Sequence, residues 1–313
     1  MQIDLFDGHC DTLSRCMETG ETLACNSGQI DLQKTAFLGR WAQFFAIFGE
    51  GNFSQFQAQY RLFQRWMVQY AKQIAHCRTA DEAERVMTSG RRAAFLSVEG
   101  AGLLDCSVEK LRMAYSMGVR AVNLTWNHAN ALSGSNQEEQ SRGLSEQGKT
   151  FVQEMVRLGM LVDVSHLSDH GFWDVEECVT GPFVATHSNA RNVFSHPRNL
   201  TDAQFTAIIK HNGVAGLNFF SDFLGRDPGI EEAAAHIEHF WALGGEKHVA
   251  LGGDWDGISR TPRGVQDVRG VSDLYELLLK RNHSEALIRD LFYFNMMRVV
   301  REVCTTSAQE IKA

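Results

Sequence analysis

Short, nearly continuous apolar runs recur along the chain, and each ends in polar or glycine residues. Eight such runs can be counted, at residues 3–11, 41–48, 92–100, 119–126, 160–166, 182–188, 213–220 and 248–257. Strands buried on both faces of a parallel sheet have this continuous character, whereas half-exposed strands alternate between apolar and polar positions. The pattern therefore predicts eight buried parallel strands.

Segments with helical periodicity lie between these runs. In residues 56–74 the apolar positions are spaced by three and four, which places them on one helix face: Phe56, Tyr60, Phe63, Met67, Tyr70 and Ile74. Residues 145–160 and 273–303 are also predicted to be helical. Within the second segment, Asn282 indicates a loop and Ser284 a helix N-cap.

Eight strands that alternate with helices predict an α/β fold, a (β/α)8 TIM barrel, formed by one domain over residues 1–313. An open, doubly wound sheet is the alternative. It is disfavoured because no G-x-G-x-x-G motif follows the first strand. Only four prolines and no low-complexity linker interrupt the chain, so nothing marks a domain boundary.

Composition narrows the class of protein. A hydrophobic fraction of 44% and a charged fraction of 22% are typical of a soluble globular protein, and the formal net charge of −8 argues against nucleic-acid binding. Seven cysteines without a C-x-x-C pair indicate reduced thiols. No apolar stretch has the length of a membrane span, and strand-like sequence from Ile3 leaves no room for a signal peptide. These features predict a cytoplasmic protein.

Candidate chemistry lies at the ends of the predicted strands, where TIM barrels carry their active sites. Each residue alone has an ordinary explanation, such as a loop acid or a satisfied core histidine. Together, three imidazoles and three carboxylates at one end of a barrel indicate divalent metal ions, because buried charges need partners. The set suits two ions bridged by a carboxylate, with zinc the best match to the donors: His9, Asp11, Glu99, His166, His187 and Asp254.

The first of these strands ends in "DGHCD". In an extended chain, side chains at positions i and i+2 share a face, so His9 and Asp11 should converge while Cys10 turns away. Cys10 is accordingly expected to be structural.

The motifs "DGHCD", "SVEGA", "LVDVSH", "ATHSNAR", "RNLTD" and "LGGDWDG" occur in an order that resembles the renal (membrane) dipeptidase family, peptidase family M19 of the amidohydrolase superfamily. The later "TPRGVQDV" and "FNMMRV" extend the resemblance over nearly the whole chain. Carried over by position, the resemblance implies one metal bound by His9 and Asp11, a second by His166 and His187, and Glu99 as the bridge.

The resemblance also implies roles beyond metal binding. Asp254 would handle the proton, and the nearby Asp256 is expected to be a loop carboxylate. Arg198 would bind the C-terminal carboxylate of the substrate, since its planar guanidinium can form two parallel hydrogen bonds. Tolerance of a D-residue at the second position, and sometimes of β-lactam rings, is a further implication.

One departure from the family pattern concerns substrate binding. The family often has a histidine after "LT" at the end of the fourth strand, but this chain has Trp126 there and His128 two residues later. Two interpretations stay open: His128 replaces the family's histidine at the substrate, or it is an ordinary loop residue.

The predicted function is hydrolysis of the amide bond of a dipeptide by a two-metal site, with Asp254 passing a proton from water to the leaving amine. Another amidohydrolase activity, on a lactone, a phosphoester or an amine, is one alternative; the usual lysine or His-x-His pair is missing from these strand ends. A non-catalytic, metal-holding barrel that binds a small peptide is the other. The expected partner is a small dipeptide, without nucleic acid or membrane, and a homodimer is compatible with the sequence.

Overall fold

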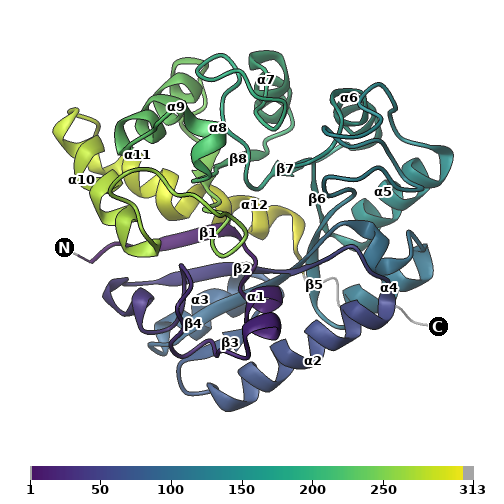
Figure 1. Ribbon diagram of the computed structural model, residues 1–313, viewed down its shortest axis with the longest axis horizontal. Helices are drawn as coiled ribbons and strands as arrows, with labels where there is room; N and C mark the ends of the chain where they lie inside the picture. Colours follow the sequence, from purple (N-terminus) through teal and green to yellow (C-terminus); the bar gives the residue numbers. More distant parts are fainter. Residues whose placement is uncertain (1, 306–313) are drawn as a thin grey trace.

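The computed structural model describes residues 2–305, which form a closed barrel of parallel strands surrounded by helices (Figure 1). The barrel strands are β1 (Leu5–Cys10), β2 (Trp41–Phe48), β4 (Arg92–Glu99), β5 (Val119–Asn123), β6 (Leu161–Asp163), β7 (Val184–Ala185), β8 (Val214–Leu217) and β9 (Val249–Leu251). Their order is β2-β1-β9-β8-β7-β6-β5-β4, and pairing of β2 with β4 closes the ring. The predicted (β/α)8 TIM barrel is confirmed.

A ninth strand, β3 (Ile74–His76), was missed by the sequence analysis. It pairs with the first residues of β4, and β5 pairs with β4 from Leu96 onward. The helix predicted over 56–74 is α2 (Phe53–Gln69), which ends before Ile74. The apolar spacing continued past the helix end because Ile74 is also buried, but in the sheet.

Helices fill the connections between strands and cover the outside of the barrel (Figure 1). They are α1 (Thr12–Thr19), α2, α3 (Ala80–Thr88), α4 (Val108–Ser116), α5 (Glu146–Leu158), α6 (Asp169–Cys178), α7 (Asp202–Lys210), α8 (Ser221–Leu224), α9 (Ile230–Ala242), α10 (Val271–Lys280), α11 (Glu285–Arg289) and α12 (Asn295–Val303). Among residues 2–305, none of the helices is both long enough and apolar enough to cross a membrane.

Local signals fix the ends of the predicted helices. Ser145 accepts a hydrogen bond from the backbone N–H of Gly148 at the start of α5, and Gly159 ends this helix in the left-handed conformation. The segment 273–303 is broken between α10 and α11, where Asn282 has a φ of 63° and Ser284 caps α11 through the Leu287 N–H. The predicted loop and N-cap are confirmed there.

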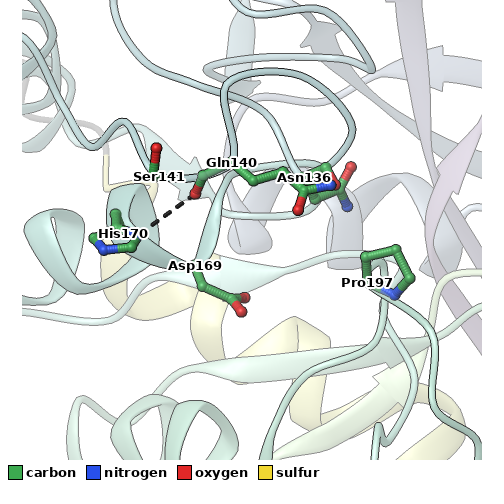
Figure 2. Close-up of a pocket in the computed structure, with 6 residues that line it drawn as sticks. All are labelled: Asn136, Gln140, Ser141, Asp169, His170 and Pro197. Atoms are coloured by element: carbon green, nitrogen blue, oxygen red, sulfur yellow. Dashed lines mark hydrogen bonds between the residues drawn. The ribbon is translucent and has the colours of Figure 1, made fainter.

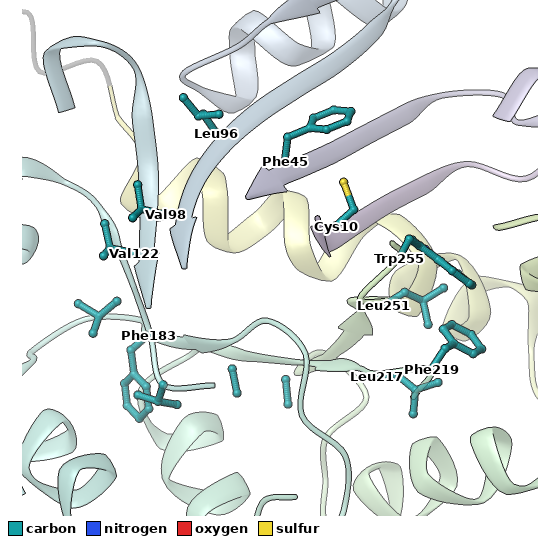
Figure 3. Close-up of a cluster of buried hydrophobic side chains, with 14 of the residues drawn as sticks. Cys10, Phe45, Leu96, Val98, Val122, Phe183, Leu217, Phe219, Leu251 and Trp255 are labelled. Atoms are coloured by element: carbon teal, nitrogen blue, oxygen red, sulfur yellow. The ribbon is translucent and has the colours of Figure 1, made fainter. Parts of the chain in front are cut away.

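Two apolar clusters hold the barrel together. The first lies between strands and helices, and Figure 3 shows Cys10 within it, near Phe45 and Trp255. The second fills the amino-terminal half of the barrel, where the rings of Phe6, Phe44 and Phe95 lie 5.2–5.7 Å apart. Buried residues of α12 belong to this second cluster, so the floor of the barrel is packed and the chemistry is confined to the carboxyl ends of the strands.

Strand β1 contains a bulge that turns His9 toward the barrel interior. Asp7 pairs with Gln43 and Cys10 with Phe45, so three steps along β1 match two steps along β2. The extra residue inverts the alternation of side chains at this point. Phe6 therefore faces the inner cluster and Cys10 the outer one, while His9 faces the site described next.

Candidate metal centre

Six buried imidazole and carboxylate side chains meet at the carboxyl ends of the strands. His9 belongs to β1 and Glu99 is the last residue of β4; the others follow their strands directly or within three residues: Asp11, His166, His187 and Asp254. The sequence analysis placed the last three at the ends of extended strands. Instead, β6, β7 and β9 end earlier, and His166 and Asp254 have positive φ values of 70° and 59°. Tight turns therefore aim these side chains, at some cost in backbone strain.

Glu99 stands at the middle of the cluster. Its Oε1 lies 3.0 Å from His166 Nε2 and 3.4 Å from His187 Nε2, and its Oε2 lies 3.3 Å from His9 Nε2. The two carboxylate oxygens thus face different histidines. This is the arrangement that a carboxylate shared between two cations requires.

Asp11 and Asp254 approach His9 from the other side. His9 Nε2 lies 3.5 Å from Asp11 Oδ2 and 3.9 Å from Asp254 Oδ1. Gly257 leaves room for both carboxylates, because a Cβ there would lie 2.0 Å from Asp11 Oδ2 and 2.7 Å from Asp254 Oδ1. Any larger residue at this position would displace one of the two acids.

Burial and crowding perturb the charges of the cluster. Burial would lower the pKa of His9, but Glu99 and Asp11 outweigh it and hold that pKa well above its usual value. Burial would raise the pKa of Glu99, but His9, His166 and His187 hold it well below its usual range. Burial and repulsion from Glu99 raise the pKa of Asp11 to about 7. Three carboxylates this close favour a cationic partner.

The residues fit bound divalent ions. Three inward-facing atoms have no hydrogen-bond partner among residues 2–305, although each is buried: His9 Nε2, His187 Nε2 and Asp11 Oδ1. Two overlapping groups have the compactness of metal ligands, His9 with Glu99 and His187, and His9 with Asp11 and Asp254. Nitrogen and oxygen donors of this kind suit zinc and similar first-row ions.

Polar groups behind the cluster hold three of its six side chains, His166, His187 and Asp254. His187 Nδ1 lies 2.8 Å from Thr186 Oγ1, whose hydroxyl also contacts Asp163, and His166 Nδ1 lies 3.0 Å from Asn127 Oδ1. Asn218 donates to Asp254 Oδ2 at 2.9 Å. Burial raises the pKa of Asp163, and hydrogen bonds from Thr186 and Ser165 oppose that rise.

These supporting residues were missed by the sequence analysis. Asp163 and Asn218 each stand inside an apolar run, in "LVDVS" and "GLNFF". A polar side chain within a buried strand needs a hydrogen-bond partner, and that requirement is the signal that could have found them.

A cavity of about 240 Å³ opens above the cluster. Asp11, Glu99, His166 and Asp254 form part of its lining, together with two apolar walls. One wall contains Phe48 and Trp126, whose ring centroids are 5.0 Å apart, and the other contains Phe220 and Phe223, 4.8 Å apart. The cavity can therefore hold a small ligand with apolar groups on both sides of the carboxylates and imidazoles.

Arg198 lies behind the second wall and is 3% exposed. Its Nη1 is 3.5 Å from Ser188 Oγ, whereas Nε and Nη2 have no hydrogen-bond partner among residues 2–305. Burial lowers its pKa to about 10, against the opposing pull of Asp254 and Glu99. A buried guanidinium with free N–H groups is a site for an anion.

The two remaining candidates near the site differ in position. Trp126 lines the cavity, but the side chain of His128 is 64% exposed and lies between Glu50, at 2.9 Å, and Glu138, at 3.3 Å. The chain bends at 126–128, so the two side chains do not share a strand face; the rings lie 5.9 Å apart, but His128 does not line the cavity. The arrangement agrees with the interpretation of His128 as a loop residue.

Asp256 has a structural environment. It accepts hydrogen bonds from the Thr12 hydroxyl at 2.7 Å and from the backbone N–H of Gln29 at 2.5 Å. These contacts tie the loop after β9 to α1 and to the segment around Gln29. Asp256 thus stabilises the loop beside the site, which agrees with its expected role as a loop carboxylate.

The loop that carries Trp126 is anchored to the cluster through its far end. The backbone N–H of Asn136 donates to the carbonyl of His166 at 2.9 Å, and His170 at the start of α6 contacts the Gln140 carbonyl at 3.4 Å. A hollow of about 290 Å³ lies between this loop, α6 and Pro197. Figure 2 shows the side chains that line it. The Asp169 carboxylate in its lining is already bound by Arg191 and Gln204. None of the six cluster residues lines this hollow, so it is separate from the metal centre.

The barrel and the cluster at its carboxyl end define a metal-dependent hydrolase. The sequence matches the family described as "Membrane dipeptidase (Peptidase family M19)" over residues 1–313, and the chain belongs to that family. It is accordingly a metal-dependent dipeptidase, a hydrolase of peptide bonds.

Individual relatives agree with this assignment. An uncharacterized protein from the pqqA 5′ region of Klebsiella pneumoniae is 34% identical over 78% of this chain and 94% of its own length. An uncharacterized dipeptidase of Schizosaccharomyces pombe is 36% identical over 75% of this chain and 59% of its own. A Rhodobacter sphaeroides metallopeptidase, solved with a phosphinate mimic of the dipeptide L-Ala-D-Ala, is 28% identical, with a TM-score of 0.88 over 97% of this chain and 100% of its own.

Proposed function

We propose that this chain hydrolyses dipeptides that have a free C-terminal carboxylate, using two divalent ions held by His9, Asp11, Glu99, His166 and His187. The observation that carries the proposal is the position of Arg198: a buried guanidinium, two of whose nitrogens have no hydrogen-bond partner within residues 2–305, near a cluster of metal-ligand type. A carboxylate bound by Arg198 would fix the C-terminus of the substrate near the cluster, which would select dipeptides over longer chains.

The ligand assignment follows the geometry of Glu99. His166 and His187 approach one of its carboxylate oxygens, and His9, next to Asp11, approaches the other. Divalent ions at these two places would polarise the amide carbonyl and acidify water.

The chain's own groups supply binding and proton transfer. Arg198 binds the carboxylate through charge-assisted hydrogen bonds. Asp254 lies at the cavity surface, 3.9 Å from His9, and carries a proton from water to the leaving amine. Burial raises the pKa of Asp254, which favours its accepting that proton.

The two apolar walls receive the side chains of the substrate. Phe223 lies 5.3 Å from the Arg198 guanidinium carbon, so the C-terminal residue belongs to the wall of Phe220 and Phe223. The first residue then packs against Phe48 and Trp126, and Trp126 rather than His128 contacts the substrate. The L-Ala-D-Ala mimic in the Rhodobacter sphaeroides relative supports acceptance of a D-residue at the second position.

The test is turnover of a panel of L,L and L,D dipeptides by protein loaded with two equivalents of zinc, each with a free or an amidated C-terminus. We expect hydrolysis of the free acids. Amidation should lower kcat/KM roughly 30-fold, because charge-assisted hydrogen bonds worth about 2 kcal/mol are lost. Equal rates for acids and amides would exclude the role of Arg198, and cleavage of lactones or phosphoesters alone would exclude the dipeptidase assignment.

Two variants make the test specific. Arg198→Met should raise KM for free acids and leave the slow amidated substrates unaffected. Arg198→Lys keeps the charge without the planar fork and should recover only part of the loss. Zinc as the bound metal, a cytoplasmic location and a homodimer stay predictions from the sequence.

A further inference from the structure

A buried chain of three side chains runs from β6 to the metal centre. Asp163, the last residue of β6, contacts the hydroxyl of Thr186, and Thr186 Oγ1 lies 2.8 Å from His187 Nδ1. All three residues are at most 2% exposed. The far ring nitrogen of His187, Nε2, points at Glu99 and has no hydrogen-bond partner among residues 2–305.

The hydrogen bonds of Asp163 give this chain a direction. Its Oδ1 accepts the backbone N–H groups of Ser165, at 2.9 Å, and Thr186, at 3.0 Å, and its Oδ2 accepts the Thr186 hydroxyl. That hydroxyl has one hydrogen, which is committed to Asp163. Thr186 Oγ1 can then only accept from His187, so Nδ1 carries the hydrogen and Nε2 keeps its lone pair.

Glu99 would stabilise the alternative tautomer of His187, which has its hydrogen on Nε2. A hydrogen on His187 Nε2 would lie toward Glu99 Oε1, 3.4 Å away, and would form a favourable hydrogen bond in the absence of metal. That tautomer cannot bind a cation, because a metal ligand needs a free lone pair. Metal binding therefore requires a group that opposes the stabilisation of the Nε2–H tautomer by Glu99, and the Thr186–Asp163 pair is placed to do so.

We propose that Asp163 and Thr186 are positioning residues that hold His187 in the tautomer with a bare Nε2. The proposal rests on the proposed function only in taking His187 as a metal ligand. A single hydrogen bond favours the same tautomer of His166, since its Nδ1 donates to Asn127 Oδ1 at 3.0 Å. The two histidines that face one oxygen of Glu99 are thus both oriented by a hydrogen bond at Nδ1, on the side of the ring away from Glu99.

Asp163→Asn tests the direction of the chain. The two backbone N–H groups still require the side-chain oxygen, so the new NH₂ group must take the place of Oδ2 and face Thr186 Oγ1. An NH₂ group donates, so Thr186 would in turn donate its hydrogen to His187 Nδ1, and the ring hydrogen would move to Nε2. The substitution is nearly isosteric, yet it should reverse the tautomer.

The first measurement is the ¹⁵N spectrum of histidine-labelled, metal-free protein, with His187 assigned through its substitution. We expect the parent to have the hydrogen on Nδ1 of His187 and Asp163→Asn to have it on Nε2, with His166 unchanged. A parent with the hydrogen on Nε2, or a variant with the parental tautomer, would overturn the proposal. A structural role for Asp163 would lower stability without changing this spectrum.

The second measurement is zinc affinity by competition with a chelator, which does not depend on turnover. Loss of an outer-shell partner typically costs 10–100-fold in affinity, and a loss of about this size is expected for Asp163→Asn. Thr186→Val should weaken zinc binding similarly, whereas Thr186→Ser keeps the hydroxyl and should bind zinc as the parent does. Equal affinities for the valine and serine variants would reject the role of Thr186.

These outcomes are separable from the dipeptidase assignment. If Asp163→Asn does not fold, the Thr186 pair still decides, because both variants keep the two backbone hydrogen bonds of Asp163. A parent with the expected tautomer and zinc affinity but no turnover of any dipeptide would contradict the proposed substrate and leave the positioning role supported.

Discussion

The immediate contacts of Asp254 fix the position of its carboxylate at the edge of the cluster. Asn218 donates to its Oδ2, its own backbone N–H donates to the His9 carbonyl at 3.2 Å, and its φ of 59° turns the side chain toward the cavity. Glu99 is surrounded by three imidazoles, whereas Asp254 touches the cluster at its edge. The different surroundings of the two acids support the proposed division of roles, with Glu99 as a metal ligand and Asp254 as the proton carrier.

Asp254→Asn should bind metal and lose turnover. The amide can still accept a hydrogen bond but cannot take up a proton, so kcat should fall by about 10²–10⁴, the range found for general acid–base groups. Metal content by elemental analysis and kcat on the best dipeptide check the two halves of the prediction. Asp256→Asn is the matched control, since Asp256 braces α1 and its loss should lower stability while kcat stays near the parental value. A near-normal kcat in Asp254→Asn would remove Asp254 from the mechanism.

At the scale of elements, the bulge in β1 decides where His9 points. Asp7 holds this bulge through four donors: the His9 N–H at 3.0 Å and Gln43 Nε2 at 2.9 Å on Oδ1, and the Gly253 N–H at 2.9 Å and Trp255 Nε1 at 3.1 Å on Oδ2. The same carboxylate thus joins β1, β2 and the turn after β9. Both ends of the metal site depend on it, His9 on one side and Asp254 on the other.

Asp7→Asn should destabilise the fold and loosen the metal site. Its NH₂ group would face two donors, so two hydrogen bonds would be lost, at a cost of about 2–4 kcal/mol in the free energy of unfolding. Urea unfolding and zinc affinity measure the two effects. Asp4→Asn, in the same segment, removes the partly exposed ion pair with Arg40, while its side-chain oxygen can still accept the Arg40 backbone N–H, so it should cost less than about 1 kcal/mol. Equal effects of the two substitutions would contradict the role of Asp7.

The order of the elements could be predicted from the sequence because each barrel strand is an apolar run. The ends of the strands could not be predicted, since the residues after β6, β7 and β9 remain buried where they line the site. Val164, Thr186 and Trp255 are all buried but lie outside the strands. Apolar character therefore continues past the last sheet hydrogen bond, and the left-handed turns at His166 and Asp254 have no compositional signal.

The residues of the cluster were predictable and their supports were not. His9, Glu99, His166, His187 and Asp254 are residue types with recognisable metal or acid chemistry, and they recur at equivalent positions. Asp163 and Asn218 act through contacts with residues 23 and 36 positions away, Thr186 and Asp254. Such pairings depend on the register of the closed barrel, which a single sequence does not specify.

For the whole molecule, the packing of the outer helices contributes to the dependence of stability on pH. His236 of α9 is fully buried; its Nδ1 accepts the Ala190 N–H at 3.0 Å and its Nε2 lies 3.2 Å from the Leu224 carbonyl. The residue therefore joins α9 to α8 and to the loop that leads to Arg198. Both contacts require the neutral imidazole, because Nδ1 accepts a hydrogen bond.

His236 should make the protein less stable in acid. Burial lowers its pKa from 6.5 to about 4, so the folded state binds fewer protons than the unfolded state between these values, and stability falls as the pH drops through this window. The group contributes almost nothing at pH 7.5 and roughly 2–3 kcal/mol of destabilisation at pH 4.5. His236→Gln keeps one acceptor and one donor without titrating. Urea unfolding of metal-free protein at pH 7.5 and 4.5 should show a smaller pH-dependent loss for the glutamine variant by about that amount. Parallel stability curves for the parent and His236→Gln would show that His236 does not cause this loss.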